Sequence, residues 1–428
     1  MNIDETMSFI GSFSKSGKPV RDLSRAEELM RRIGNPEKQL KFVHIAGTNG
    51  KGSTVEYISN ALILSGYRTG QFTSPFIRRY NDRIRINGAE IDDASLCEIA
   101  DIVRQKADSP DYSQFEITMA IALLWFLREK CDVVVFECGI GGALDCTNII
   151  PPPLLAVITS ISLDHTAILG DTVEEIAKQK AGIIKKGSVT VLSADNNKSL
   201  SKIIRKTAER KGSFFVQPVQ SCIKICDTLS TTHFSYKQSF RTHRYRLSMA
   251  GVCQVYNAVT AIEACFWLKT RYGFGISQKH IERAVETTAI KCRMQYIYSA
   301  DMPTVLVDGG HNPAGINNLA LELAGWKEIG KKLYIIMGMV DTKDFEYGVS
   351  RISALAEKMF CVDDFAANSV AAGRIAEIAE DHTEAEICGS LTEAVENAES
   401  LAAENNGLIV VCGSLYLASK YLNDCDNQ

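Results

Sequence analysis

The sequence predicts an α/β protein with two domains. Short apolar, strand-like runs alternate with helical segments, which is the pattern of a mostly parallel sheet covered by helices. Glycine-rich or acidic clusters follow several of these runs directly, and parallel sheets bind their ligands at the carboxyl ends of strands. The alternation is interrupted between residues 190 and 246 and restarts near residue 290. We therefore expect a domain at 1–295 with a small antiparallel flank, and a smaller Rossmann-like α/β C-terminal domain at 296–428.

Each predicted element follows from the spacing of its apolar residues and from the turn-forming residues at its ends. In the first domain we expect strands at 42–46, 68–72, 131–137 and 156–160, and helices at 23–33, 115–130 and 255–269. The short, polar, strand-rich pieces between 190 and 246 are typical of antiparallel pairing. In the second domain we expect strands at 303–307, 333–337, 358–362 and 407–412, and the hinge is expected within 289–301.

The composition excludes several classes of protein. The 428 residues are 46% hydrophobic and 23% charged, as in a globular chain rather than a disordered or fibrous one. The net charge is −4, so no basic field favours nucleic acid or a membrane surface. The sequence has no run of ~18 apolar residues, and its acidic N-terminus does not resemble a signal peptide. Because the 13 cysteines are scattered without a C-x-x-C pair, we expect a reduced, cytoplasmic protein.

Residues 47–54, the phosphate loop, form the clearest motif. Gly47-Thr48-Asn49-Gly50-Lys51-Gly52-Ser53-Thr54 lies between a predicted strand and a predicted helix. Glycines let backbone N–H groups turn toward one anion, the helix N-terminus is positive, and Lys51 adds a full charge. Ser53 or Thr54 is suited to the Mg²⁺ that accompanies a nucleotide. The pattern departs from the standard motif, because Gly52 separates the lysine from the hydroxyl residue, yet it predicts a P-loop-type ATPase domain.

Polar residues also lie at the ends of two later predicted strands, 131–137 and 156–160. Glu137 ends a buried strand, where an unpaired carboxylate is costly, so Mg²⁺ is the expected partner and a cap of the next turn is the alternative. The following Gly139-Ile140-Gly141-Gly142 is not a dinucleotide fingerprint, because Leu144 stands where the third glycine is required. His165, after Asp164, is either a Mg²⁺ ligand or a structural histidine.

Four further residues have an ordinary structural interpretation, and three of them also have a functional one. Lys180, taken alone, is expected to be a solvated helix lysine. Asp308 and His311 end a strand in a glycine-rich turn, where they are suited to a ribose or form a simple turn. Arg293 lies near the expected hinge, where it would reach a phosphate or stay exposed.

These motifs, in this order, resemble the folylpolyglutamate synthase and dihydrofolate synthase family of the Mur ligase superfamily. The resemblance covers nearly the whole chain and begins with the phosphate loop. Its further motifs are Thr73-Ser74-Pro75-Phe76, Asn81-Asp82-Arg83-Ile84, Phe115-Glu116, Glu137 to Gly142 with Asp145 and Thr147-Asn148, Asp164-His165, Leu169 to Thr172, Lys180 to Ile184, and Asp308 to Pro313. Ala143 departs from the family pattern, in which arginine is frequent.

The resemblance implies a role for each matching position. The phosphate loop would hold the ATP phosphates, with further nucleotide contacts from Asn257, Arg293, Asp308 and His311. Two Mg²⁺ ions would be held by Ser74, Glu137, His165 and Lys180, the lysine being carbamylated by CO₂. The implied catalytic residues are Lys51, Glu137, His165, Lys180 and Arg293. Ser74, Phe76 and Asp145 would contact the folate.

The implied activity is an ATP-dependent ligation. The γ-phosphoryl group of ATP would pass to a folate carboxylate, the α-amine of L-glutamate would attack the acyl phosphate, and ADP and phosphate would leave. The expected partners are folate polyglutamate and L-glutamate, and the expected cofactors are ATP and Mg²⁺, with K⁺ as a further candidate. We expect a monomer.

Three alternatives stay open. A bifunctional enzyme would also make dihydrofolate from dihydropteroate, and it would differ at a pterin site around 12–21 and 143–145. A peptidoglycan Mur ligase is expected to have a UDP-sugar domain before its ATP loop, and here this loop starts at residue 47. A catalytically silent, nucleotide-binding regulatory module would lack the predicted catalytic set, which is present in full.

Overall fold

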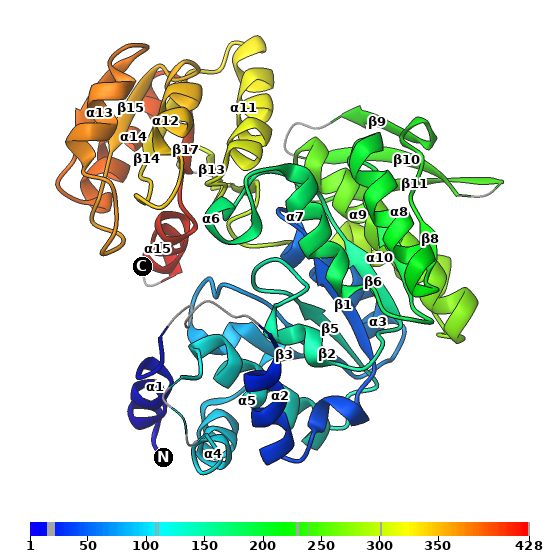
Figure 1. Ribbon diagram of the computed structural model, residues 1–428. Coiled ribbons are helices and arrows are strands. Elements are labelled where there is room, and N and C mark those ends of the chain that lie inside the picture. The colour runs from blue at the N-terminus through cyan, green and yellow to red at the C-terminus, as the bar shows by residue number, and fades with distance from the viewer. Residues whose placement is uncertain are drawn as a thin grey trace. The chain divides into compact units, whose positions relative to one another are not determined.

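The protein folds into two compact units. The computed structural model describes residues 1–14, 22–107, 109, 111–227, 231–238, 240–299 and 302–426. The first unit comprises Met1–Cys222 and Tyr256–Glu286, and the second comprises Ile223–Val255 and Thr287–Gln428 (Figure 1). Ile223–Val255, which precedes the predicted boundary at 295/296, thus belongs with the second unit. The boundary itself stays a prediction.

The first unit is built on an eight-stranded sheet with the order β4-β3-β2-β5-β1-β6-β7-β8. The six strands from β2 to β8 in this order are parallel, and β3 and β4 extend one edge in antiparallel orientation. The strands are β1 (Phe42–Ala46), β2 (Thr69–Phe72), β3 (Ile84–Ile86), β4 (Ala89–Glu90), β5 (Val133–Glu137), β6 (Leu155–Ile158), β7 (Val189–Leu192) and β8 (Phe214–Val216). The mostly parallel sheet predicted from the sequence is confirmed.

Helices cover this sheet and create its core. They are α1 (Ile3–Gly11), α2 (Ser24–Arg32), α3 (Lys51–Leu64), α4 (Asp93–Arg104), α5 (Gln114–Arg128), α6 (Thr166–Leu169), α7 (Val173–Lys180), α8 (Lys198–Lys211), α9 (Val252–Tyr272) and α10 (Gln278–Thr287). On one face, α1, α2, α4 and α5 pack over Phe42, Phe72 and Phe136, whose ring centroids lie 5.0–5.3 Å from the next ring. In the part of the chain that the structure describes, every helix is too short or too polar to cross a membrane.

The antiparallel region begins later than predicted. Residues 190–216 contribute β7 and β8 to the parallel sheet, with helix α8 between them. The side chain of Asn197 caps α8 by accepting from the Leu200 N–H, and the buried residues Leu200, Ile204 and Ala208 repeat at helical spacing. The numerous lysines of this segment obscured that period, so the strand-rich interpretation of its first part was wrong.

The second unit contains the antiparallel flank and a second α/β sheet. The flank has the order β11-β10-β9 and consists of β9 (Ile223–Asp227), β10 (Thr232–Gln238) and β11 (Arg241–Leu247). The α/β sheet has the order β12-β13-β17-β14-β15-β16, and only β12 is antiparallel to its neighbour. Its strands are β12 (Gln295–Ile297), β13 (Val305–Val307), β14 (Leu333–Met337), β15 (Lys358–Cys361), β16 (Glu384–Ile387) and β17 (Leu408–Cys412), and its helices are α11 (Pro313–Glu328), α12 (Phe345–Ser353), α13 (Ala372–Ala379), α14 (Leu391–Glu404) and α15 (Leu415–Asp426). Both predicted sheet types are therefore confirmed.

Candidate active site

The phosphate loop connects the central strand β1 to helix α3. Gly50 has φ of +81°, a conformation that glycine adopts without strain, and the helix begins at the next residue. The Thr48 N–H donates to the Ser160 carbonyl at 2.7 Å, and the Thr159 hydroxyl donates to the Asn49 carbonyl at 2.7 Å. The end of β6 thereby holds the loop on both sides. The loop places a helix N-terminus at the carboxyl edge of the sheet, as an anion site requires.

Two glycines of this loop allow close approach of polar side chains. A Cβ atom on Gly47 would lie 1.7 Å from the Thr159 hydroxyl oxygen, and one on Gly50 would lie 2.1 Å from the Asn257 side-chain oxygen. The predicted adenine contact Asn257 is thus beside the phosphate loop, although it comes from α9, more than two hundred residues later. It is buried. Any larger residue at position 47 or 50 would displace these partners.

Lys51 and the two hydroxyl residues after it face different environments. The Lys51 ammonium folds back over the loop and donates to the carbonyls of Gly47 and Thr48, at 3.2 Å each. The cation thus lies against two carbonyl oxygens of the loop itself. Ser53 is 4% exposed, and the Thr54 hydroxyl is buried without a hydrogen-bond partner in the structure. A buried hydroxyl in this state is suited to a ligand oxygen or a hydrated cation.

Glu137 brings a buried carboxylate to the same edge. It is the last residue of β5, the strand beside β1, and it is 3% exposed. Its Oε2 accepts a 3.1 Å hydrogen bond from the backbone N–H of Ser74, which follows β2. A Cβ atom on Gly52 would lie 3.9 Å from the same oxygen. The structure thus brings Ser74, Glu137 and the start of α3 together.

The loop after β5 is held by a buried polar network. Asp145 accepts from the Ile140 N–H at 2.9 Å and from the Thr147 N–H and hydroxyl at 3.0 and 2.5 Å. The Thr147 oxygen also lies 2.9 Å from Nε2 of His44, inside β1. Since the Thr147 hydroxyl donates to the carboxylate, the histidine donates to Thr147. Burial lowers the pKa of His44 to about 3, so the ring is neutral at neutral pH.

Lys180 is the residue that the sequence pattern alone misjudged. It ends α7 but is only 2% exposed, so the solvated interpretation is wrong. Burial, together with the positive charge of Lys51, lowers the pKa of Lys180 to about 7. The loop after β5 packs against it, because a Cβ atom on Gly142 would lie 3.0 Å from the Lys180 carbonyl oxygen. A substantial fraction of the amine is therefore uncharged at neutral pH.

His165 lies at the end of the loop after β6. It has φ of +50°, and its N–H donates to Asp164 Oδ1 at 2.9 Å. Its side chain is 40% exposed, and its Nε2 is 4.0 Å from Asp164 Oδ2. An exposed ring beside a carboxylate does not fit a buried structural histidine.

The predicted folate contacts divide into exposed and buried groups. Phe76 is 40% exposed, and the Arg83 guanidinium lies 5.1 Å from its ring centroid. Asp145, in contrast, is 8% exposed, and its oxygens are occupied by the turn described above. Burial raises the pKa of Asp145, while hydrogen bonds from Thr147 oppose the rise. Most of the predicted pterin segment 12–21 lies outside the described residues.

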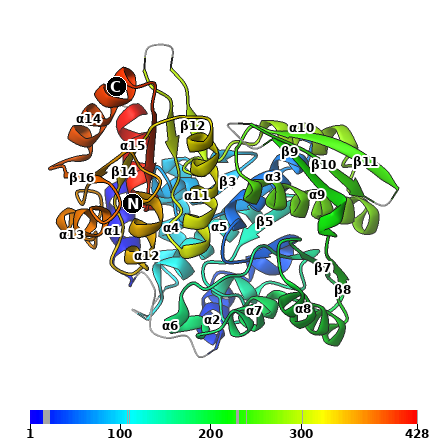
Figure 2. The ribbon, with the colours of Figure 1, turned by 90° about the horizontal axis from the view of Figure 1, so that it is seen from above.

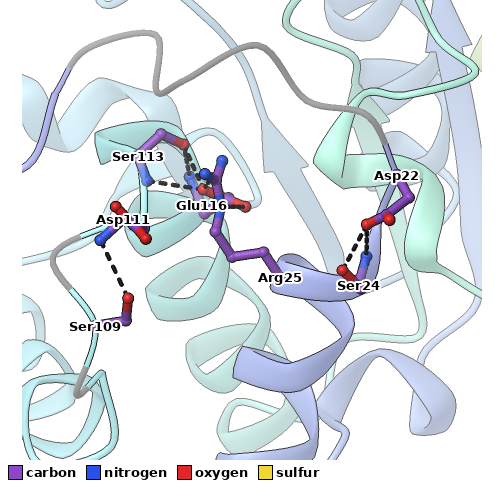
Figure 3. A network of polar contacts seen from close by, with 7 residues as sticks. All are labelled: Asp22, Ser24, Arg25, Ser109, Asp111, Ser113 and Glu116. Atoms are coloured by element: carbon purple, nitrogen blue, oxygen red, sulfur yellow. Dashed lines mark hydrogen bonds and ion pairs between the residues drawn. The ribbon is translucent and has the colours of Figure 1, made fainter.

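The first turn of helix α5, which begins at Gln114, is anchored by an ion pair (Figure 3). Arg25 of α2 donates from Nε to Glu116 Oε1 at 2.9 Å, and its NH2 lies 2.8 Å from Oε2. Glu116 also accepts from the N–H and hydroxyl of Ser113, at 2.7 and 2.8 Å. The neighbouring Phe115 ring would be 2.8 Å from a Cβ atom on Gly139. The pair therefore fixes a helix end against the loop that follows Glu137.

The second unit has a polar cluster of its own at the end of β13. Asp308 is 5% exposed and accepts from the N–H groups of Met294 and Gly310, at 2.9 and 2.8 Å. Burial raises the pKa of Asp308, and the charge of Arg293 opposes this effect. His311 Nδ1 lies 3.1 Å from the Gly309 carbonyl oxygen. The structure thus groups Arg293, Asp308 and His311, so Arg293 is not an isolated linker residue.

The sequence analysis gave no role to several residues that support the site. Thr159 and Ser160 hold the phosphate loop from β6, and Asn148 donates to the carbonyls of Ala143 and Gly182 at 3.1 and 3.3 Å. Gly182 is equally necessary, because a Cβ atom there would lie 2.3 Å from the Cα of Ala143. Thr159 and Ser160 could have been found from the sequence, because these two hydroxyl residues directly follow a buried strand. Asn148 and Gly182 belong to the family motifs Thr147-Asn148 and Lys180 to Ile184, but the sequence analysis gave neither residue a role.

The fold and this site define a Mur ligase. The Mur ligase middle domain matches residues 45–265, and the Mur ligase glutamate ligase domain matches residues 292–415. The chain belongs to the folylpolyglutamate synthase and dihydrofolate synthase family of Mur ligases, and it is an acid–amino-acid ligase.

Relatives in two organisms document this membership. The dihydrofolate synthase/folylpolyglutamate synthase of Bacillus subtilis is 35% identical over 360 residues, which are 82% of this chain and 83% of the relative. The folylpolyglutamate synthase of Lacticaseibacillus casei is 32% identical over 434 residues, 98% and 97% of the two chains. Among solved structures, the apo form of L. casei FPGS has a TM-score of 0.85 at 29% identity and covers 99% and 100%. An FPGS-AMPPCP-folate complex has a TM-score of 0.84 at 29% identity, with the same coverage.

Proposed function

We propose that the protein uses ATP and Mg²⁺ to join L-glutamate to the γ-carboxylate of folate and of folate polyglutamates, through an acyl phosphate. The relatives are named for this reaction, and one solved neighbour is a complex with AMPPCP and folate. The observation that most strongly supports the proposal is the meeting of the phosphate loop, Glu137 and Lys180 at one edge of the first sheet. The same edge supplies both an anion site and buried groups for a cation.

The chemistry requires charge neutralisation and positioning. A carboxylate is a poor acyl donor, so transfer of the γ-phosphoryl group converts one of its oxygens into a leaving group. We propose that the N–H groups of the phosphate loop and the Lys51 ammonium hold the triphosphate and stabilise the charge that develops during transfer. The uncharged α-amine of glutamate then forms the amide bond as phosphate leaves. Arg293, Asp308 and His311 remain predicted nucleotide contacts.

The residues at this edge fit Mg²⁺. Mg²⁺ prefers oxygen ligands and is commonly bound by one or two carboxylates together with substrate phosphates. Within the described residues, no three histidine, cysteine or acidic side chains gather as a metal site on their own, which suits a cation completed by ATP. We propose Ser74, Glu137 and His165 as the protein groups that hold Mg²⁺. When bound, the ion would neutralise the charge of the phosphates.

Lys180 is suited to carbamylation. Its uncharged amine would attack CO₂, forming an N–C bond and releasing one proton, which turns the neutral amine into an anionic carbamate. Burial favours this reaction because it already disfavours the ammonium form. We propose that the carbamate is a further Mg²⁺ ligand.

A second activity is favoured by the B. subtilis relative, which is named for both reactions. We propose dihydrofolate synthesis as the alternative, with Ser74, Phe76 and Asp145 near the folate. We further propose a cytoplasmic monomer, in line with 13 free cysteines, and K⁺ as a candidate activator.

Phosphate release tests these proposals. The purified chain is supplied with ATP, Mg²⁺ and glutamate, and with either a reduced folate or dihydropteroate. We expect turnover with the reduced folate, and turnover in both arms would establish the bifunctional alternative. No turnover in either arm would contradict the proposed ligation and favour a silent nucleotide-binding module. Omission of KCl from parallel assays tests the K⁺ requirement.

A further inference from the structure

Helix α8 has a row of cations along its outer face. Lys198, Lys202, Lys206 and Arg210 are spaced four residues apart, so their side chains lie one above another, and all four are exposed. These four residues are called the basic column. The opposite face of the helix is apolar and packs into the core of the first unit. The column is therefore the solvent face of a helix that is firmly held.

Among the described residues, the basic column has no anionic partner. Within the part of the chain that the structure describes, none of its four side chains forms an ion pair with a carboxylate. Arg210 donates to the Thr207 hydroxyl at 3.2 Å, which leaves its charge uncompensated. Including the flanking residues Arg205, Lys211 and Glu209, α8 has a net charge of +5 in a chain whose total is −4. Positive charge is thus concentrated here.

This arrangement is electrostatically unfavourable for the helix itself. Like charges four residues apart repel, and a cation in the first turn opposes the helix dipole. Lys198 is the first residue of α8, and the first turn contains no acidic residue. Other helices of the same unit do the opposite, since Glu28 pairs with Arg31 and Arg32 on α2. Repulsion along α8 would be relieved by a bound polyanion.

The column starts at the edge of the sheet where the candidate active site lies. Asn196, two residues before α8, donates to the Thr159 carbonyl at 3.1 Å and accepts from the Ile161 N–H at 3.0 Å. Thr159 in turn holds the phosphate loop. Helices α7 and α8 lie side by side (Figures 1 and 2), and the Ser199 hydroxyl donates to Glu174 at 3.2 Å. The basic column therefore extends from this edge along the side of the first unit.

We propose that the basic column binds the γ-linked glutamate chain of the substrate, an inference that rests on the proposed function. Each γ-linked residue has one free α-carboxylate. Three backbone bonds of an extended peptide span 3.3–3.6 Å, so the five bonds of a γ-linked residue span about 6 Å. Residues four apart on a helix are separated by about the same distance, ~6 Å. Successive carboxylates of the chain thus match successive cations of the column.

Other polyanionic surfaces fit the column less well. A membrane would require the apolar face of α8, but Leu200, Ile204 and Ala208 are buried. A nucleic acid favours a broad basic surface, whereas this feature is one side chain wide in a chain with net negative charge. The four cations span twelve residues, about 18 Å, which suits a short flexible chain with regularly spaced carboxylates.

The test compares substrates of different chain length in a charge-reversal variant. Lys202→Glu/Lys206→Glu creates opposite charges next to Lys198 and Arg210, so α8 should be at least as stable as before. We expect the ratio of KM for the pentaglutamate to KM for the monoglutamate to rise about tenfold, because two favourable charge pairs become repulsive. Higher ionic strength should raise the wild-type KM for the pentaglutamate selectively. The control Lys41→Glu/Lys279→Glu, which reverses two exposed lysines elsewhere, should leave the ratio unchanged.

A second readout separates this inference from the proposed function. A free γ-linked pentaglutamate peptide is titrated onto the wild-type chain and both variants without ATP, and we expect about tenfold weaker binding only in Lys202→Glu/Lys206→Glu. If neither folate is turned over by the wild type, the proposed function fails and the peptide titration alone decides on the column. An unchanged KM ratio with unchanged peptide affinity would overturn the inference. Loss of nucleic-acid binding in that variant, with peptide affinity unchanged, would also overturn it.

Discussion

Burial gives two basic side chains of the first unit a proton affinity far from their ordinary one. Both burial and the positive charge of Lys51 favour the uncharged form of Lys180. His44 is enclosed within β1, and its Nδ1 has no hydrogen-bond partner among the described residues, so a second proton would be poorly stabilised. The lowered pKa of Lys180 supplies the uncharged amine that the proposed carbamylation requires. The lowered pKa of His44 makes the stability of the folded protein sensitive to acid.

Lys180→Ala should reduce turnover by more than about 100-fold, as expected when a group that stabilises charge in the transition state is removed. Short-chain carboxylates such as acetate should restore part of the rate by occupying the position of the carbamate. Lys178→Ala, an exposed lysine on the same helix, is the matched control and should behave as wild type. Phosphate release measures both, and a wild-type rate in Lys180→Ala would remove the carbamate from the mechanism.

His44 should make the protein less stable as the pH falls. The pKa of His44 is about 3 in the folded chain and 6.5 in the unfolded chain. As the pH falls, the unfolded chain therefore binds a proton that the folded chain does not bind. The loss begins near pH 6.5 and continues to about pH 3, and it amounts to about 2 kcal/mol by pH 5. Urea unfolding at several pH values measures it. His44→Gln should show a loss smaller by that amount, and an equally steep loss in this variant would show that other groups are responsible.

At the scale of elements, the site depends on helix ends held by side chains from other segments. Helix α5 begins at a capping box between Ser113 and Glu116, which the sequence pattern alone supports. Arg25 of α2 then pairs with the same carboxylate, so two helices share one buried charge (Figure 3). This shared charge links the N-terminal helices to the loop after Glu137.

Arg25→Ala should destabilise the protein by about 2 kcal/mol, because it removes hydrogen bonds to a charged carboxylate that is nearly buried. Glu116→Gln should cost less when Arg25 is already absent, since the two residues act as a pair. A double-mutant cycle measured by denaturant unfolding gives the coupling energy. Arg31→Ala, on the exposed side of α2, is the control, and additive effects of Arg25 and Glu116 would contradict the shared-charge interpretation.

At the scale of the whole molecule, the predicted nucleotide contacts belong to both compact units. The phosphate loop and Asn257 are in the first unit, whereas Arg293, Asp308 and His311 form their own cluster in the second.

A non-hydrolysable ATP analogue with Mg²⁺ should raise the unfolding free energy by about 2.7 kcal/mol when its concentration is a hundred times its Kd. Chelation of Mg²⁺ should reduce this gain. His311→Ala should also reduce it if His311 contacts the nucleotide, while His382→Ala, an exposed histidine of the same unit, should not. Thermal unfolding monitored by circular dichroism measures the gain, and an identical gain in His311→Ala would remove this residue from the nucleotide contacts.

The strength of the local signals explains which expectations the structure confirms. The strand, glycine loop and helix at 42–64 were predictable, because buried β-type residues, turn-forming glycines and an apolar helix follow each other within one short segment. The segment around α8 was predicted as strands, although it forms a helix. Its many lysines and arginines make the helical spacing of only three buried apolar residues hard to recognise. The roles of the site residues remain predictions that the substitutions above test.

The α/β class, the phosphate loop and the family were recognisable from the amino-acid sequence, because each of these depends on residues that are neighbours along the chain. The folded chain is needed to see that Lys180 is buried, that Asn257 reaches the phosphate loop, and that Asn196 places the basic column at the same sheet edge. These properties depend on desolvation and on contacts between segments far apart in sequence. Such contacts arise only when the strands have taken their order in the sheet.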